Sequence, residues 1–301
     1  MMRRRRLIYT QDLTKYYGKV VGIESLFLEV AEGESFGLLG LDGSGKTTAV
    51  QLLLGLVRPT RGQGEVMGFN IAKHSHQIRR LAGCMPGGFS FYEDLTGDEF
   101  LALCSRLRRN QAHRRSELVE KLELDPGRKF LDYSLVDKRK IALVQALMHD
   151  PQLLILDNPT IGLDHLSKET VYEMLMEERA KGKTLILSTN SPSEITRLCD
   201  RVGILRAGYL AQTQDVAELR NRLGRRVQVT FHQDVDLEDI ITEDVSVISH
   251  EGRQWVLAVR HEMGSLIKRI AEYSVADVKY LEGTMEEALI GMLRSERRAL
   301  Y

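Results

Sequence analysis

The sequence predicts an α/β protein with a parallel sheet, joined to a smaller α+β domain. From residue 7 to about residue 209, short apolar runs typical of buried strands alternate with helical segments. The runs LLILD (153–157) and TLILST (184–189) flank one such helix, and this order of strand, helix and strand forms a crossover with parallel pairing. Past residue 215 the pattern changes, so we expect domains at 7–214 and 215–301.

Composition indicates a globular protein. The 301 residues are 43% hydrophobic, which is enough for one large core and a smaller appended domain. Lys plus Arg and Asp plus Glu both number 42, so no overall basic field attracts nucleic acid, and we expect no nucleic-acid partner. Cys84, Cys104 and Cys199 form no CxxC pair, which argues against a zinc site and a disulfide framework and suggests reduced, cytosolic thiols.

The sequence predicts no membrane-spanning segment. The longest apolar run, at 52–57, is far shorter than the roughly 20 residues that cross a bilayer. The N-terminal arginines precede LIYTQDLTKYY (7–17) rather than the apolar core of a signal peptide. The run Arg3–Arg6 fits either contact with anionic lipid headgroups or a solvated tail.

Within the first domain we expect a helical insertion at about 82–150, where strand patterns disappear. The segment at 96–109 opens with a Thr cap and an acidic first turn, and a second helical segment follows at 114–124. In the crossover helix between the two apolar strands, Leu175 and Met176 are expected to face inward.

The second domain is expected to contain four strands and two helices. The strand patterns are RRVQVTF (225–231), VSVIS (245–249), RQWVLAV (253–259) and VADVKYL (275–281), with a turn at Glu251 and Gly252. The helical patterns are MGSLIKRIAEY (263–273) and a terminal helix, MEEALIGMLRSE (285–296).

Residues 40–47 fit the spacing G-x-x-x-x-G-K-[ST] between an apolar strand and a helical segment, the context that supports a phosphate-binding loop. Glycines let backbone N–H groups turn toward a phosphate, and the following helix adds its positive end. Lys46 is expected to contact the β- and γ-phosphates, and Thr47 to place its hydroxyl on Mg²⁺. The expected nucleotide-binding residues of this loop are Gly40, Leu41, Asp42, Gly43, Ser44, Gly45, Lys46, Thr47 and Thr48.

Asp157 ends the apolar strand at 153–157, where a carboxylate reaches a Mg²⁺ ion held by Thr47, usually through a water. An aspartate at a strand end is weak support for a metal site when taken alone. Combined with the phosphate loop it predicts a Mg-nucleotide site, with Thr47 and Asp157 as the metal-associated residues.

From about residue 8 to residue 210 the chain resembles the nucleotide-binding domain of ABC transporters. LTKYYG (13–18) is similar to the loop whose aromatic residue stacks on adenine, so Tyr17 is the candidate, a surface tyrosine in a turn being the alternative. PTIGLD (159–164) is similar to the D-loop, with Asp164 at its usual place. The resemblance implies ATP and Mg²⁺ as cofactors.

Three positions linked to hydrolysis depart from the family pattern. Asn158 stands where the family has a glutamate that polarises the attacking water, and loss of a positioned general base costs about 10²–10⁴-fold in rate. Asn190 stands at the position of the switch histidine. Gly87 stands at the glutamine that contacts Mg²⁺ and couples to the membrane subunit.

The fourth departure lies in the segment that resembles the family signature, YSLVDKRKIALVQAL (133–147). Ser134 is retained as the candidate contact to ATP bound on the opposite subunit. Leu135 and Val136 replace two glycines whose backbones approach that γ-phosphate, and their side chains resist the approach.

The resemblance implies a subunit that binds MgATP and hydrolyses it poorly or not at all. ABC domains work as head-to-tail pairs, and a homodimer of this chain would contain two impaired sites. A heterodimer with a more active ATP-binding subunit is therefore expected, docked on membrane permease subunits as a peripheral protein of the cytoplasmic face. The C-terminal domain resembles domains appended to exporter subunits, which favours export. Either this domain has a regulatory or dimerising role, or it only packs against its own core.

Other classes of function are possible on the sequence. A soluble ABC-type switch acting on ribosomes or DNA is disfavoured by the single nucleotide domain, the zero net charge and the lack of a long basic arm. A regulator that binds ATP without any permease stays open. A kinase or GTPase would require the stretches that resemble the adenine loop and the D-loop to be accidental.

Overall fold

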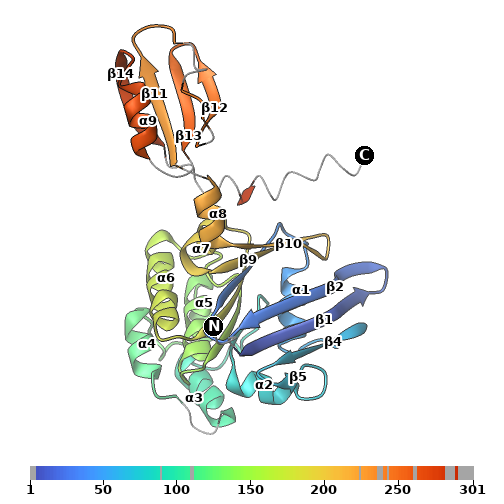
Figure 1. The fold of residues 1–301 in the computed structure, drawn as a ribbon. Helices are drawn as coiled ribbons and strands as arrows, with labels where there is room; N and C mark the ends of the chain where they lie inside the picture. The colour runs from blue at the N-terminus through green and yellow to red at the C-terminus, as the bar shows by residue number, and fades with distance from the viewer. Residues whose placement is uncertain are drawn as a thin grey trace. The chain divides into compact units, whose positions relative to one another are not determined.

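A six-stranded sheet with strand order β10-β9-β3-β8-β7-β6 forms the core of the larger part of the chain (Figure 1). Every residue of β3, β7 and β8 is buried, as parallel strands covered on both faces require. The pairs β3–β8, β3–β9, β7–β8 and β6–β7 are all parallel. The strands are β3 (Ser35–Leu39), β6 (Gly83–Met85), β7 (Leu153–Asp157), β8 (Thr184–Thr189), β9 (Arg201–Arg206) and β10 (Tyr209–Asp215).

The computed structural model describes residues 5–88, 90–108, 112–223, 225–235, 240–242, 244–259, 263–281 and 289–290. The chain divides into two compact units, Met1–Thr213 and Gln214–Tyr301. Among the described residues, no helix combines the length and the apolar character needed to cross a membrane.

A second sheet of the first unit is antiparallel, with strand order β2-β1-β4-β5. Its inward side chains, such as Ile8 and Leu26, are fully buried and belong to the same apolar cluster as Phe36 of β3. The two sheets therefore share one core. The strands are β1 (Arg6–Tyr17), β2 (Val20–Ala31), β4 (Arg61–Val66) and β5 (Phe69–Asn70).

Helices complete the first unit, and in Figure 1 α3, α4 and α6 lie on the opposite side of it from the antiparallel sheet. The α-helices are α1 (Lys46–Leu53), α2 (Ser75–Leu81), α3 (Gly97–Leu107), α4 (Arg115–Lys121), α5 (Leu135–Leu147), α6 (His165–Ala180) and α7 (Pro192–Leu198), and a 3₁₀ turn, η1, spans Phe130–Asp132. Thr96 and Glu99 form a capping box at α3, which confirms the predicted start of this helix.

Two sequence-based expectations about this unit are wrong. Residues 82–150 are not free of strands, because β6 pairs in parallel with β7 and so belongs to the central sheet. Three residues carry too short a pattern to be distinguished from a loop. Met176 is 37% exposed, whereas Leu175 is fully buried, because the apolar stripe of α6 continues through Val171 and Met174 instead.

The second unit begins with α8 (Val216–Leu223) and contains an antiparallel sheet of order β12-β13-β11-β14 with one helix, α9 (Met263–Ile270). Its strands are β11 (Arg225–Phe231), β12 (Val245–Glu251), β13 (Gln254–Val259) and β14 (Val275–Leu281). Val229, Leu257 and Leu266 are fully buried in a separate core. Except for residues 289–290, the predicted helix at 285–296 lies outside the described residues, as do Arg3 and Arg4.

Candidate nucleotide site

The predicted phosphate loop, residues 40–48, runs from the end of β3 into the first turn of α1. Gly43 and Gly45 have φ angles of 77° and 103°, which L side chains rarely adopt. A Cβ atom on Gly45 would lie 2.4 Å from the Gly22 carbonyl oxygen, and one on Gly40 would lie 2.7 Å from the Leu205 carbonyl oxygen. The path of this loop therefore depends on glycine for conformation and for space.

Lys46 and Ser44 give the loop its polar interior. The Lys46 side chain is 5% exposed, and its Nζ donates to the carbonyl oxygens of Gly40 at 2.8 Å and Leu41 at 2.9 Å. Burial lowers the pKa of Lys46, while Asp42 and Asp157 act to raise it. The Ser44 hydroxyl is buried and has no hydrogen-bond partner among the described residues. An unpaired hydroxyl, a buried cation and a helix N-terminus fit a phosphate group.

Tyr17 lies beside this loop at the end of β1. A Cβ atom on Gly22 would be 2.8 Å from the Tyr17 ring and 2.9 Å from the Thr48 side chain, so ring and loop are neighbours. The Tyr17 hydroxyl donates to Gln51 of α1 at 3.4 Å, and the ring is 45% exposed. An exposed aromatic face next to a phosphate loop is the arrangement that stacking on a base requires.

Asp157 ends β7 and is completely buried. It is opposite Ser188 in the parallel register, and the Ser188 hydroxyl donates to its Oδ1. Because β3, β8 and β7 are successive parallel strands, Asp157 and the phosphate loop share the carboxyl edge of the sheet, where such sheets bind ligands.

Asp157 and the Thr47 hydroxyl on the first turn of α1 are hard oxygen groups of the kind that suit Mg²⁺. The described residues contain no group of three or more His, Cys, Asp or Glu side chains able to hold a metal ion.

Asn158 follows Asp157 in the left-handed conformation, with φ 49°, which Asn tolerates better than most residues. Its side-chain amide donates to Asp157 Oδ1 at 3.2 Å. The backbone carbonyl oxygen of Asn158 accepts a hydrogen bond from the Arg139 guanidinium of α5 at 3.1 Å. Asn158 thus stabilises the neighbouring carboxylate, a contact that a glutamate carboxylate is unable to make.

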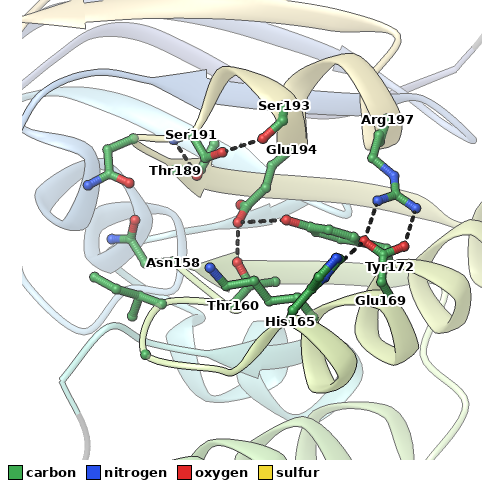
Figure 2. Close-up of a pocket in the computed structure, with 14 residues that line it drawn as sticks. Asn158, Thr160, His165, Glu169, Tyr172, Thr189, Ser191, Ser193, Glu194 and Arg197 are labelled. Carbon is green, nitrogen blue, oxygen red and sulfur yellow. Dashed lines mark hydrogen bonds and ion pairs between the residues drawn. The ribbon is translucent and has the colours of Figure 1, made fainter. Parts of the chain in front are cut away.

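Asn158 and Asn190 both line a pocket of about 410 Å³ between the segment at 158–162, α6 and α7 (Figure 2). Behind them Glu194 is 4% exposed and accepts hydrogen bonds from the hydroxyls of Thr160 and Tyr172. Sequence reasoning missed these residues because Glu194 lies 34 positions from its partner Thr160, and no local pattern connects them.

Arg197 and Glu169 close the opposite side of this pocket. The two terminal guanidinium nitrogens of Arg197 donate to the two carboxylate oxygens of Glu169 at 2.7 and 2.8 Å. The guanidinium carbon lies 4.4 Å from the centre of the Tyr172 ring. The pocket is thus polar. Both oxygens of Glu169 accept hydrogen bonds, whereas Glu194 accepts only through Oε1, and its buried Oε2 has no partner among the described residues.

Ser134 and Asp164 are both helix caps. The Ser134 hydroxyl accepts from the Asp137 backbone N–H at 3.1 Å, and the Ser134 backbone N–H donates to the Asp137 carboxylate at 3.2 Å, which forms a capping box at α5. The Ser134 hydroxyl also donates to this carboxylate at 2.8 Å. Asp164 caps α6 by accepting from the Ser167 backbone N–H at 2.9 Å, and the hydrogen bonds from Ser167 lower its pKa. The Asp137 carboxylate at the start of α5 opposes the binding of a second anion there.

Residues 23–161 match the family described as ABC transporter. The bacitracin transport ATP-binding protein BcrA of Enterococcus faecalis is 31% identical over 288 residues, which cover 90% of this chain and 93% of that protein. The linearmycin resistance ATP-binding protein LnrL of Bacillus subtilis is 32% identical over 224 residues, which cover 72% of each chain. A solved ATP-binding subunit of an ABC transporter superposes with a TM-score of 0.66 at 29% identity and covers 72% of this chain and 92% of its own.

The fold and the match to BcrA over nearly the whole length of both chains confirm the α/β fold class and the family that the motifs predicted. The chain belongs to the ATP-binding proteins of the ABC transporter family.

Proposed function

We propose that this chain is the catalytically weak ATP-binding subunit of an asymmetric ABC transporter. It binds MgATP, pairs with a second and more active ATP-binding subunit, and drives membrane permease subunits from the cytoplasmic face, with export favoured. The observation that carries the proposal is the contrast between a complete phosphate loop and an amide, Asn158, at the position of the general base.

Nucleotide binding rests on three groups. Tyr17 offers a ring for the base, while Lys46, Ser44 and the N-terminus of α1 hold the phosphates. Thr47 and Asp157 are the oxygen ligands for Mg²⁺, which when bound would neutralise phosphate charge. The phosphate loop and Asp157 lie at the carboxyl edge of the six-stranded sheet, and Tyr17 of β1 lies beside the loop, so a single nucleotide can contact all of these groups.

Weak hydrolysis rests on the surroundings of Asn158. Its amide donates to Asp157 and has no basic atom for the proton of an attacking water. Asn190, directly after β8, is also uncharged. Of the two carboxylates that line the adjacent pocket, Glu169 is paired with Arg197. Glu194 accepts from Thr160 through Oε1, while its buried Oε2 has no partner among the described residues.

An unlike partner is supported by the start of α5. The Ser134 hydroxyl is hydrogen-bonded to Asp137, which also adds negative charge. Leu135 is 79% exposed at a position where the close approach of a phosphate needs a small residue. Two copies of this chain would combine two weak sites, whereas a subunit with an intact base supplies one site that turns over. That turnover is expected to be slow, because the Ser134 segment of this chain completes the site. The BcrA and LnrL relatives, named for bacitracin transport and linearmycin resistance, support a transporter rather than a soluble switch.

The test measures binding and turnover on one preparation. A fluorescent ATP analogue is titrated into the chain and into Lys46→Ala. ATP hydrolysis is followed for the chain alone and after co-expression with candidate permease and ATP-binding subunits from the same genome. We expect binding that Lys46→Ala abolishes, little turnover alone, and turnover in the complex. Rapid hydrolysis by the isolated chain would contradict the proposal, and failure to co-purify with any permease would favour a soluble regulator.

A further inference from the structure

β14 is an edge strand of the second unit. In the order β12-β13-β11-β14 its only neighbour among the described strands is β11. From Asp277 to Leu281 the two strands pair residue for residue in antiparallel register, and the side chains from Ala276 to Tyr280 are all exposed. The outer side of such a strand presents backbone N–H and C=O groups to which another strand can add.

The apolar side chains of β14 extend the core of the second unit to this edge. Val278 pairs with Val229 and Tyr280 with Val227, and both valines of β11 are buried. Because directly opposite residues point to the same face of a sheet, Val278 and Tyr280 continue that apolar face. They are nevertheless 48% and 56% exposed. A further strand along β14 would cover them.

Asp277 and Lys279 lie on the other face of β14, on either side of Val278. Lys279 Nζ lies 3.2 Å from Asp277 Oδ2, and the lysine and aspartate side chains are 63% and 49% exposed. A lysine on an edge strand normally discourages pairing with another sheet. When two copies of β14 pair antiparallel about a two-fold axis at Val278, however, Asp277 of each copy lies opposite Lys279 of the other. An axis at Asp277 or at Lys279 would bring like charges together, so the charges favour one register.

We propose that β14 joins two copies of this chain through their second units, in the antiparallel register centred on Val278. The interface is isologous, so Asp277 and Lys279 form two identical ion pairs between the copies. On the apolar face Val278 packs against Val278 of the other copy. The contact uses no group of the nucleotide site, so it is independent of the proposed function and of the unlike subunit that completes that site.

The first test is analytical ultracentrifugation of the full chain over a range of concentrations, in EDTA and without nucleotide, so that pairing at the nucleotide site does not contribute. The wild type is expected to show an equilibrium between monomer and dimer. Lys279→Asp places like charges opposite each other twice, and is expected to raise the dissociation constant by about tenfold. Combining it with Asp277→Lys exchanges the two charges, restores both pairs and should return the constant to the wild-type value.

Arg253 provides the matched control for the charge reversal. Its side chain is 59% exposed, similar to that of Lys279, and it also pairs with an aspartate, Asp234. Because Arg253 lies outside β14, Arg253→Asp is expected to leave the dissociation constant unchanged.

Cross-linking tests the register in a nearly native chain. The three natural cysteines are buried, so a thiol-specific cross-linker reaches an introduced surface cysteine first. Val278→Cys is expected to give a covalent dimer with a short cross-linker, because opposite Cβ atoms lie about 5 Å apart. Ile248→Cys, on the opposite edge strand β12 and 44% exposed, is the control and should stay monomeric.

A monomer at every concentration would overturn the pairing and leave the proposed nucleotide site standing. A dimer that Lys279→Asp does not weaken, or that the exchange of charges does not restore, would overturn it as well. Should a charge variant fail to unfold as cooperatively as the wild type, the cross-linking decides: a covalent dimer of Val278→Cys alone supports the pairing, and equal yields from Val278→Cys and Ile248→Cys overturn it.

Discussion

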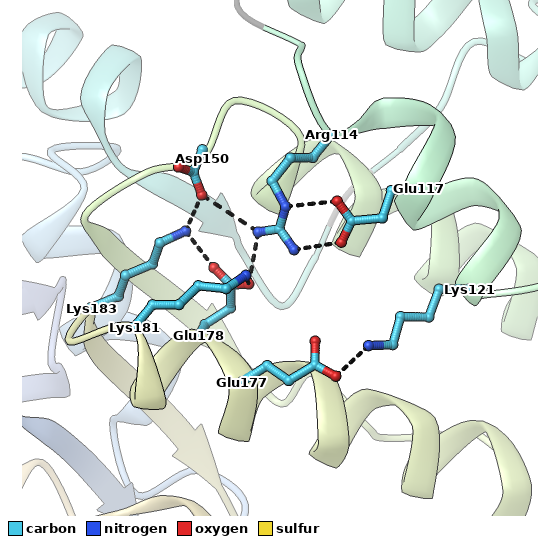
Figure 3. Close-up of polar contacts among 8 residues, drawn as sticks. All are labelled: Arg114, Glu117, Lys121, Asp150, Glu177, Glu178, Lys181 and Lys183. Atoms are coloured by element: carbon cyan, nitrogen blue, oxygen red, sulfur yellow. Dashed lines mark hydrogen bonds and ion pairs between the residues drawn. The ribbon is translucent and has the colours of Figure 1, made fainter.

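Glu178, near the end of α6, and Lys183, directly before β8, form an ion pair in which the two side chains are only 2% and 3% exposed (Figure 3). Arg114, at the start of α4, donates to the same carboxylate at 2.7 Å. Lys183 also contacts Asp150 between α5 and β7. The network joins α4, from the helical part of the first unit, to the helix that follows the nucleotide site.

Removal of the central charge is expected to destabilise the fold strongly. Glu178→Gln leaves the buried Lys183 with only the half-exposed Asp150 as counter-ion, and breaking a buried pair from one side costs up to about 3–5 kcal/mol. Glu177→Gln is the matched control, because its bridge to Lys121 is solvent-exposed and worth less than about 1 kcal/mol. Urea unfolding of both variants measures the difference, and similar losses would show that the buried pair has no special role.

His149 is expected to make the free energy of unfolding depend on pH, at pH values above those at which carboxylates titrate. Burial, reinforced by Arg108, lowers the pKa of His149 to about 4. Since the unfolded chain protonates this residue near its ordinary pKa of about 6.5, the stabilisation is present above that value and decreases as the pH falls toward 4.

The measurement is the urea midpoint between pH 7 and pH 5. We expect it to fall for the wild type and to fall less for His149→Phe, which has no proton to bind. His165, whose side chain is 89% exposed, provides the control, and His165→Phe should retain the slope of the wild type. An unchanged slope in His149→Phe would assign the pH dependence to other groups.

Tyr17 is expected to hold the base of the nucleotide by stacking. Tyr17→Phe keeps the ring and loses only the 3.4 Å hydrogen bond to Gln51, so it should bind ATP nearly as the wild type does. Tyr17→Ala should weaken binding by about 1–3 kcal/mol, or roughly 5- to 150-fold. Fluorescence titration of both variants tests this, and equal affinities of Tyr17→Ala and the wild type would identify Tyr17 as a surface residue.

Asn158→Glu is expected to lower the stability of the protein and to raise its rate of ATP hydrolysis. The variant loses the hydrogen bond to Asp157, places a second negative charge beside it, and puts a residue poorly suited to left-handed φ at 49°. Thermal unfolding should show a lower midpoint, while ATP turnover should rise by up to about 10²-fold because a general base is present. Asn158→Ala separates the effects, since it loses the hydrogen bond without adding a base and should show no gain in turnover.

The parts of the site that are contiguous in the chain were predictable from the amino-acid sequence alone. The phosphate loop is a local strand, turn and helix, so its glycine spacing and Lys46 predict the conformation of the backbone. The distant Gly22 and Leu205 add the limit on space at Gly45 and Gly40. The same holds for the capping box of Thr96 and Glu99, which spans a single helical turn. Asp157 was predictable because it ends an apolar run long enough to define a buried strand.

The surroundings of Asp157, in contrast, depend on how distant parts of the chain fold together. Gly87, Ser188 and Asn158 meet at its carboxylate, and the first two are 70 and 31 positions away in the chain. The pairing of β6 with β7 brings the Gly87 segment there, and three residues of β6 carry no periodic pattern. Contacts between residues so far apart in sequence depend on the register of parallel strands and on the packing of loops at their ends. A local sequence pattern therefore does not predict them.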